Sequence, residues 1–185
     1  GAMPIDNVVI RDTHPSEWLT ISEVLAYSSN ICAAKIGMAM GEEKLYDAMR
    51  RFGLGQSTGL PLPGESTGTL RPRGRPWVQV ETAAASFGQG VTVTNLQMAM
   101  GAAAIANGGE LLEPILVSKV TSATGEPVRD AAPSVRRRVV PKWVARAVTQ
   151  MMVGVTEGDA TGTEAAIPGF VVAGKTATAQ KADPR

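Results

Sequence analysis

The chain has 185 residues, with 18 Lys and Arg against 17 Asp and Glu, so its formal net charge is +1. This length favours one compact domain, and the near-neutral charge gives no reason to expect nucleic acid or an anionic membrane surface as a partner. Cys32 and His14 are the only residues of their types, so we expect no internal disulfide, no zinc site and no cofactor.

The first three residues do not look like part of a natural domain. Gly1-Ala2-Met3 resembles the scar that a protease leaves on a recombinant protein, and we exclude residues 1–3 from the predicted fold. No run of 18 apolar residues and no signal-peptide pattern occurs in the chain.

Two helices joined by a polar corner are predicted first. Thr20 and Glu23 have the spacing of a capping box, and apolar residues follow at helical intervals, which predicts a helix over about 20–27. The triplet Ser28-Ser29-Asn30 prefers turns and caps. The 3.6-residue period then resumes over 31–40.

The middle of the chain alternates helices with a long loop. A helix over 42–52 carries acidic residues first and basic residues last, as the helix dipole favours. Residues 53–77 are rich in Gly and Pro and predict a long, ordered but irregular loop. Helical character returns over 77–86. A further helix, capped by Thr94, is apolar nearly all round and is expected inside the core.

The last third is predicted to contain strands and one helix. Residues 114–139 suggest a small β excursion with a turn at 124–127. The run 136–138, three consecutive arginines, is interpreted as a solvated segment before a helix that begins at Pro141. A terminal strand is predicted from 169 to about 178.

Two short stretches carry side chains suited to chemistry. The corner Ser28-Ser29-Asn30 can pass a proton or hold a carbonyl, although three capping residues would look the same. The stretch 175–178, Lys-Thr-Ala-Thr, places a lysine among small and hydroxyl residues, although a protective lysine on an edge strand would also fit. Neither stretch decides the function alone.

Together, the two stretches resemble Ser-x-Asn and Lys-Thr-Gly, the second and third signatures of the penicillin-binding proteins and serine β-lactamases. The blocks "LTISEVLAYSSNICAAKIGMAMGEEKLYDAMRRFGLGQSTGLPLPGESTG", "FGQGVTVTNLQMAMGAAAIANGG" and "VAGKTATAQKADP" resemble the class B, division-type members, which are monofunctional peptidoglycan transpeptidases. The resemblance covers about residues 16–184. It implies an α+β fold: the mostly helical portion of a transpeptidase domain, with the Lys-Thr-Gly-type strand at its C-terminal end.

The resemblance also implies roles for individual residues. Ser28 would pass a proton between an amine and the catalytic lysine, and Asn30 would hydrogen-bond that lysine and a carbonyl of the bound peptide. Lys175 would hold the Ser28 hydroxyl and attract the substrate carboxylate, to which Thr176 and Thr178 would offer hydroxyls. The backbone N–H of Thr178 corresponds to one oxyanion-hole donor.

The chain departs from the family pattern in two ways. Ala177 stands where the family usually has Gly, and its methyl group is expected on the same face as Lys175, narrowing the site. No Ser-x-x-Lys occurs, so the nucleophile and its lysine base are missing. The residues three positions before each lysine are Cys32, Gly41, Leu116, Val139, Val172 and Thr178.

Residues 4–185 are therefore expected to be a partial transpeptidase (penicillin-binding) domain, truncated at both ends and unable to acylate. In such a piece the strand that carries Lys175 would lose its neighbouring strands, which leaves its backbone donors and acceptors unpaired. We therefore expect this strand to pair between copies of the chain or to be irregular.

The resemblance implies a parent enzyme that crosslinks D-Ala-D-Ala stem peptides at division through a serine acyl-enzyme. It would bind β-lactams and divisome proteins, and it would be anchored in the inner membrane with this domain on the periplasmic face. The alternative is a noncatalytic pseudo-transpeptidase scaffold that binds cell-division partners. A generic helical domain with accidental motifs would need three extended stretches to match by chance.

Overall fold

The computed structural model describes residues 1–70 and 75–179. The length predicted one compact body, whereas the structure groups the chain into two compact units, each with its own apolar core. The first unit comprises Gly1–Asp47, Arg71–Val91 and Ala147–Arg185, and the second comprises Ala48–Leu70 and Thr92–Arg146.

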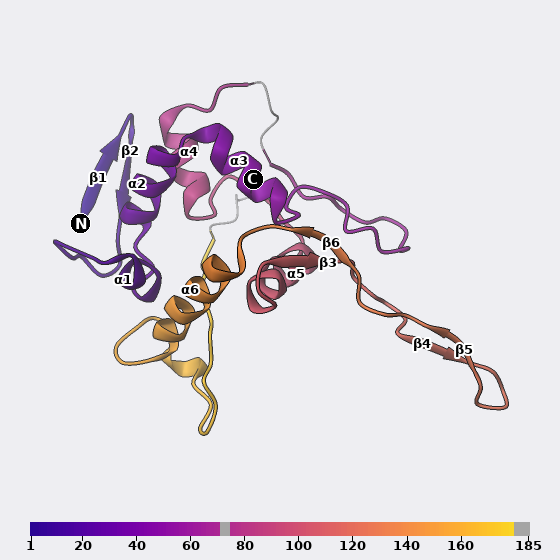
Figure 1. Cartoon of the computed structure of the whole chain (residues 1–185). Coiled ribbons are helices and arrows are strands. Elements are labelled where there is room, and N and C mark those ends of the chain that lie inside the picture. Colours follow the sequence, from indigo (N-terminus) through magenta and orange to yellow (C-terminus); the bar gives the residue numbers. More distant parts are fainter. Residues whose placement is uncertain (71–74, 180–185) are drawn as a thin grey trace, which may run out of the picture. The chain divides into compact units, whose positions relative to one another are not determined.

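The first unit opens with an antiparallel hairpin of β1 (Ala2–Ile5) and β2 (Val8–Arg11), which lies beside a helix, α2 (Figure 1). Met3 pairs with Ile10 across the hairpin and packs against a buried cluster. The exclusion of residues 1–3 from the fold was therefore wrong for Ala2 and Met3, because both lie in β1. The residues of this core are Ile5, Ile10, Ile31, Ala34 and Ala83.

The predicted helices of this part of the chain are confirmed. Thr20 and Glu23 form the expected capping box, and Ser29 caps the helix that follows the polar corner. The helices are α1 (Ile21–Ala26), α2 (Asn30–Met40), α3 (Glu42–Arg51) and α4 (Gln79–Ser86), and the division between the units falls within α3.

Helices α2 and α4 pack closely because one residue of α2 has no side chain. A Cβ atom on Gly37 would lie 1.7 Å from the Ser86 Oγ and 2.7 Å from the Ser86 Cβ. Only glycine fits at position 37 at this helix separation.

The segment before α4 is held by α3. The Trp77 and Tyr46 rings meet edge to face, with centroids 6.4 Å apart and an interplanar angle of 88°. The Trp77 backbone N–H also donates to the carboxylate of Glu42. Trp77 is consequently half-buried, whereas Trp18 and Trp143 are 91% and 74% exposed.

The first unit ends in an extended segment. It follows α6 (Lys142–Val153), which crosses the division between the units, and two short 3-10 turns, η1 (Gly154–Thr156) and η2 (Thr163–Ala165). The strand predicted for 169–178 is not formed among the described residues, because no neighbouring strand pairs with it. Residues 171–177 alternate in exposure as an extended chain does, although none of them lies in a strand.

The second unit is built on α5 (Asn95–Ala106) and two antiparallel pairs. β3 (Glu110–Leu112) pairs with β6 (Val135–Arg138), and β4 (Lys119–Thr121) pairs with β5 (Pro127–Asp130). The second pair is the predicted β excursion, and it extends away from β3 and β6 (Figure 1). No helix in the described part of the chain is long and apolar enough to cross a membrane.

The prediction that α5 lies inside the core was wrong. Of its residues only Gln97 and Ala104 are buried, and Met98 is 54% exposed. One side packs on β3 and on the core of this unit, which is too small to surround a helix. That core is formed by Ala104, Leu111 and Val139, with Phe52, Met100 and Val140 packed against it.

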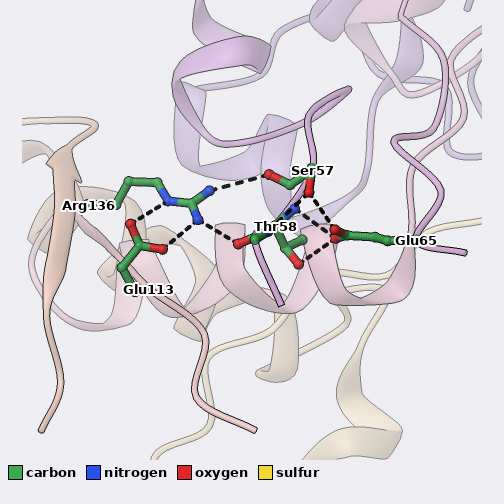
Figure 2. Close-up of polar contacts among 6 residues, drawn as sticks. Ser57, Thr58, Glu65, Glu113 and Arg136 are labelled. Atoms are coloured by element: carbon green, nitrogen blue, oxygen red, sulfur yellow. Dashed lines mark hydrogen bonds and ion pairs between the residues drawn. The ribbon is translucent and has the colours of Figure 1, made fainter. Parts of the chain in front are cut away.

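The loop predicted for 53–77 is ordered and irregular over residues 53–70, as expected, while 71–74 lie outside the described residues. Glu65 accepts hydrogen bonds from the Thr58 backbone N–H at 2.7 Å and from the hydroxyls of Ser57 and Thr58 (Figure 2). These donors lower the pKa of Glu65 to about 2. The buried side chain of Gln97 donates to two further loop carbonyls, at 2.7 and 2.8 Å.

The arginine run was wrongly interpreted as a solvated segment. Arg136 donates to both oxygens of Glu113, at 2.9 and 2.5 Å, and to the Thr58 carbonyl at 2.5 Å (Figure 2). Arg137 donates to the last carbonyls of α3, and Arg138 donates to the Gly108 carbonyl. The run lies in β6, so successive side chains point to different acceptors.

Candidate active site

The structure brings Ser28 and Lys175 together. The Lys175 Nζ donates to the Ser28 Oγ at 2.7 Å and to the Thr176 carbonyl at 2.9 Å. Lys175 is exposed as a whole residue, but partial burial around its ammonium lowers its pKa, because removing water disfavours the charged form. By donating to the Ser28 oxygen, the Lys175 ammonium can hold the Ser28 hydroxyl, a group able to transfer a proton, in one orientation.

The backbone at Ser28 has an unusual conformation. Its φ is +55°, a left-handed value that residues with a Cβ seldom adopt. On one side Ser28 and Ser29 are bound to the end of α1, since their N–H groups donate to the Leu25 and Val24 carbonyls at 3.3 and 3.1 Å. On the other side α2 begins at Asn30. Ser28 therefore forms the turn between two helices.

The other two corner residues are bound to the end of β2. The buried Ser29 donates its hydroxyl to the Asp12 Oδ2 at 2.6 Å and accepts from the Cys32 N–H at 3.1 Å. The Asn30 Nδ2 donates to the Arg11 carbonyl at 3.2 Å. In the described part of the chain, no hydrogen bond joins Asn30 to Lys175.

Thr161 links the two stretches. Its backbone N–H and its hydroxyl both bind the Ala26 carbonyl, at 3.1 and 3.0 Å, just before the corner. The same hydroxyl lies 2.8 Å from the Thr176 Oγ1. The residue before Lys175 is also fixed, since the Gly174 N–H donates to the Met152 carbonyl at 3.1 Å. These bonds determine the separation of the two stretches.

The last described residues of the extended segment, 177–179, are exposed. Lys175 and Ala177 are exposed, whereas Val172, Gly174 and Thr176 are half-buried. Ala177 and Thr178 make no hydrogen bond to another described residue.

A pocket of about 350 Å³ lies next to the corner and is lined in part by His14, Trp18 and Glu23. At its wall the Tyr27 hydroxyl donates to the Asp159 Oδ1 at 3.1 Å, and this contact raises the pKa of Tyr27. No group of three or more His, Cys, Asp or Glu suited to a metal ion occurs among the described residues.

Comparison with known proteins decides the family. Residues 4–185 match the family model of the penicillin binding protein transpeptidase domain. The chain belongs to this family.

Its relatives agree with the resemblance to class B, division-type penicillin-binding proteins. The chain is 35% identical over 192 residues to penicillin-binding protein PbpB of Mycobacterium tuberculosis, covering 100% of this chain and 28% of that protein. It is 38% identical over 175 residues to peptidoglycan D,D-transpeptidase FtsI of Escherichia coli K12, covering 95% and 28%. The chain thus spans well under half the length of either relative.

A solved structure confirms the α+β fold expected for this penicillin-binding-protein domain. It is that of penicillin binding protein 3 from Mycobacterium tuberculosis complexed with aztreonam, with a TM-score of 0.88 and 34% identity. The match covers 100% of this chain and 42% of that one. The transpeptidase domain from Burkholderia pseudomallei penicillin-binding protein 3 gives a TM-score of 0.86.

Sequence reasoning proposed candidate site residues for this penicillin-binding-protein domain. It identified Ser28, Asn30 and Lys175, of which the structure joins Ser28 to Lys175 directly. It missed Asp12 and Thr161, which bind the corner. Asp12 follows the apolar run 8–10 after one arginine, which is a weak signal. Thr161 stands in a Gly-rich segment that carries none.

Proposed function

We propose that the complete protein containing this chain is a serine-type peptidoglycan D,D-transpeptidase of cell division, acylated by β-lactams. It would crosslink D-Ala-D-Ala stem peptides through an acyl-enzyme. The observation that carries the proposal is the 2.7 Å hydrogen bond from the Lys175 Nζ to the Ser28 Oγ. Relatives named as D,D-transpeptidases and related structures complexed with aztreonam and ampicillin support it.

The proposed role of Ser28 follows from its hydrogen bonding. A hydroxyl has one donor hydrogen and two acceptor lone pairs, and the ammonium of Lys175 occupies one lone pair. Among the described residues, no other group hydrogen-bonds to the Ser28 hydroxyl, so its hydrogen and second lone pair are available there. Ser28 can therefore donate a proton to a leaving amine and accept one from an attacking amine, as a proton shuttle must.

The remaining residues would bind the peptide and the lysine base. Asn30 donates one amide hydrogen to the Arg11 carbonyl and makes no other side-chain hydrogen bond to the described residues. Its Oδ1 would accept from an ammonium, and its other amide hydrogen would be donated to a peptide carbonyl. The charge of Lys175 and the hydroxyls of Thr176 and Thr178 would attract the substrate carboxylate. The Thr178 N–H would serve as an oxyanion-hole donor.

Ala177 is exposed, as Lys175 is, and its methyl would narrow the site on the lysine face. Ala177→Gly in the complete protein is expected to speed β-lactam acylation. An unchanged rate would show that the methyl does not restrict the site.

The 185 residues contain no Ser-x-x-Lys, so we propose that they do not acylate by themselves. In the complete protein, the nucleophile and its lysine base would face Ser28 and Asn30. An inner-membrane anchor, a periplasmic position of the domain and binding to divisome proteins are further parts of the proposal.

Labelling with a fluorescent penicillin tests the function. The complete natural protein should form about one covalent adduct per molecule, and the 185-residue chain should form none. Lys175→Met in the complete protein should slow acylation by roughly a hundredfold, whereas Lys44→Met, on an exposed position of α3, should leave the rate unchanged.

Two results would overturn the proposal. An adduct on the 185-residue chain would mean that another nucleophile operates. A complete protein that forms no adduct would instead fit a noncatalytic scaffold for cell-division partners.

A further inference from the structure

Asp12 binds the Ser28–Asn30 corner with both carboxylate oxygens. Its Oδ2 accepts from the Ser29 hydroxyl at 2.6 Å, and its Oδ1 accepts from the Ile31 backbone N–H at 3.0 Å. Asp12 is half-buried, and its two partners are nearly inaccessible, at 3% and 8% exposed. Charge-assisted hydrogen bonds in such a setting are strong and directional.

Ser28 itself needs external support. A non-glycine residue with φ near +55° persists only where the surrounding structure imposes it. The end of α1 fixes the chain before Ser28, through the bonds to the Val24 and Leu25 carbonyls. Asp12 fixes the chain after it, since both of its partners lie within three residues of Ser28.

The residue before Asp12 reinforces the arrangement. The Arg11 carbonyl accepts from the Asn30 side chain, so two consecutive residues at the end of β2 bind Ser29, Asn30 and Ile31. The β1–β2 hairpin is itself anchored, because Ile5 and Ile10 are buried in the core of the first unit. The corner is thus attached to a packed element that has no hydrogen bond to Lys175 among the described residues.

We infer that Asp12 is a positioning residue, which acts through Ser29 to hold Ser28 in the conformation that directs its hydroxyl to Lys175. Among the described residues, Asp12 hydrogen-bonds to neither the Ser28 hydroxyl nor Lys175. The consequence for catalysis rests on the proposed function, whereas the effect on conformation does not.

Nuclear magnetic resonance on the 185-residue chain tests the conformational step. A positive φ brings the amide hydrogen of Ser28 close to its own Hα, which gives a strong intraresidue Overhauser effect. Asp12→Ala should weaken this signal and raise the pKa of Lys175, measured at its Cε, because the ammonium regains water. Asp12→Asn keeps one acceptor oxygen and should restore both readouts in part.

The controls separate positioning from general loss of structure. Ser29→Ala removes the Asp12–Ser29 hydrogen bond from the other side and should change the Ser28 Overhauser effect and the Lys175 pKa in the same directions. It replaces Asp12→Ala in the test if that variant does not fold. Glu17→Ala, on an exposed residue with no hydrogen bond to the described residues, should change nothing. The inference is wrong if Asp12→Ala and Ser29→Ala leave the signals of Ser28 and Lys175 unchanged. It is also wrong if these signals change no more than the amide signals of α2 do.

Acylation of the complete protein separates this inference from the proposed function. Asp12→Asn should slow penicillin acylation by roughly tenfold, and Asp12→Ala should slow it further. A normal rate in Asp12→Ala would overturn the positioning role and leave the function standing. The opposite outcome is also distinguishable. If the complete protein forms no penicillin adduct even with Asp12 present, but the variants show the expected changes at Ser28, the proposed function is wrong and the positioning role stands.

Discussion

The ammonium of Lys175 lies 2.7 Å from the hydroxyl oxygen of Ser28, although 147 positions of sequence separate the two residues. Partial burial of this ammonium favours the neutral amine, so the folded chain releases the proton at a lower pH than the unfolded chain does. The partial burial of this ammonium therefore links the stability of the chain to pH, apart from the proposed role of Lys175 in catalysis.

The first prediction concerns pH. Between the lowered pKa of Lys175 and the ordinary lysine value of about 10.4, the unfolded chain binds more protons, so this lysine makes stability rise with pH. Urea unfolding across this window should show a steeper rise for the unaltered chain than for Lys175→Met. Lys44→Met should keep the original slope. Equal slopes for all three chains would contradict the prediction.

The second prediction concerns Glu65, whose pKa of about 2 reflects hydrogen bonds from Ser57 and Thr58. Its folded-state pKa is below the unfolded value, so the stability it contributes is present at neutral pH and is lost as pH falls toward 2. Glu65→Gln should be less stable than the unaltered chain at pH 7, and the difference should shrink in acid. Glu126→Gln, whose carboxylate bonds to no described residue, is the matched control.

The third prediction concerns the arginine run. Arg136 holds Glu113 and the loop carbonyl of Thr58 together, and Arg136→Met should cost about 2 kcal/mol of unfolding free energy. Arg129→Met, in the exposed strand β5, should change stability by less than about 0.5 kcal/mol. Denaturant unfolding measures both variants. Similar losses of unfolding free energy in Arg136→Met and Arg129→Met would mean that the hydrogen bonds of Arg136 do not add to stability.

The fourth prediction compares two helical glycines. Gly37→Ala places a Cβ against Ser86 and should destabilise the chain by about 1–3 kcal/mol. Gly101, in α5, has only a Phe52 atom 4.0 Å from such a Cβ, so Gly101→Ala should stabilise by about 0.5–1 kcal/mol. The two thermal midpoints should move in opposite directions. Adding Ser86→Gly to Gly37→Ala should recover part of the lost stability. Ser86→Gly alone should not stabilise the otherwise unaltered chain.

Local patterns were sufficient where the structure depends on neighbours in sequence. The capping box of Thr20 and Glu23 predicted the start of α1, and the periodicity after Asn30 predicted α2. The family motifs identified Ser28 and Lys175 because both signatures are short and continuous. None of these predictions needed a distant partner.

Other features failed because they depend on partners elsewhere in the chain. Three adjacent arginines look solvated until carbonyls from α3 and the 57–59 loop come within reach. An apolar helix such as α5 indicates burial only if enough surfaces surround it. A run such as 169–178 indicates a strand only if another strand pairs with it. Asp12 and Thr161 were missed for the same reason.

The unequal exposure of the three tryptophans makes the intrinsic fluorescence of the chain selective. Trp18 and Trp143 are already in contact with water, so their emission should change little on unfolding. Trp77, half-buried with its ring against Tyr46, should account for most of the spectral shift. An unfolding curve recorded by tryptophan emission will therefore follow the packing of one segment against α3, while the second unit stays largely invisible to this probe.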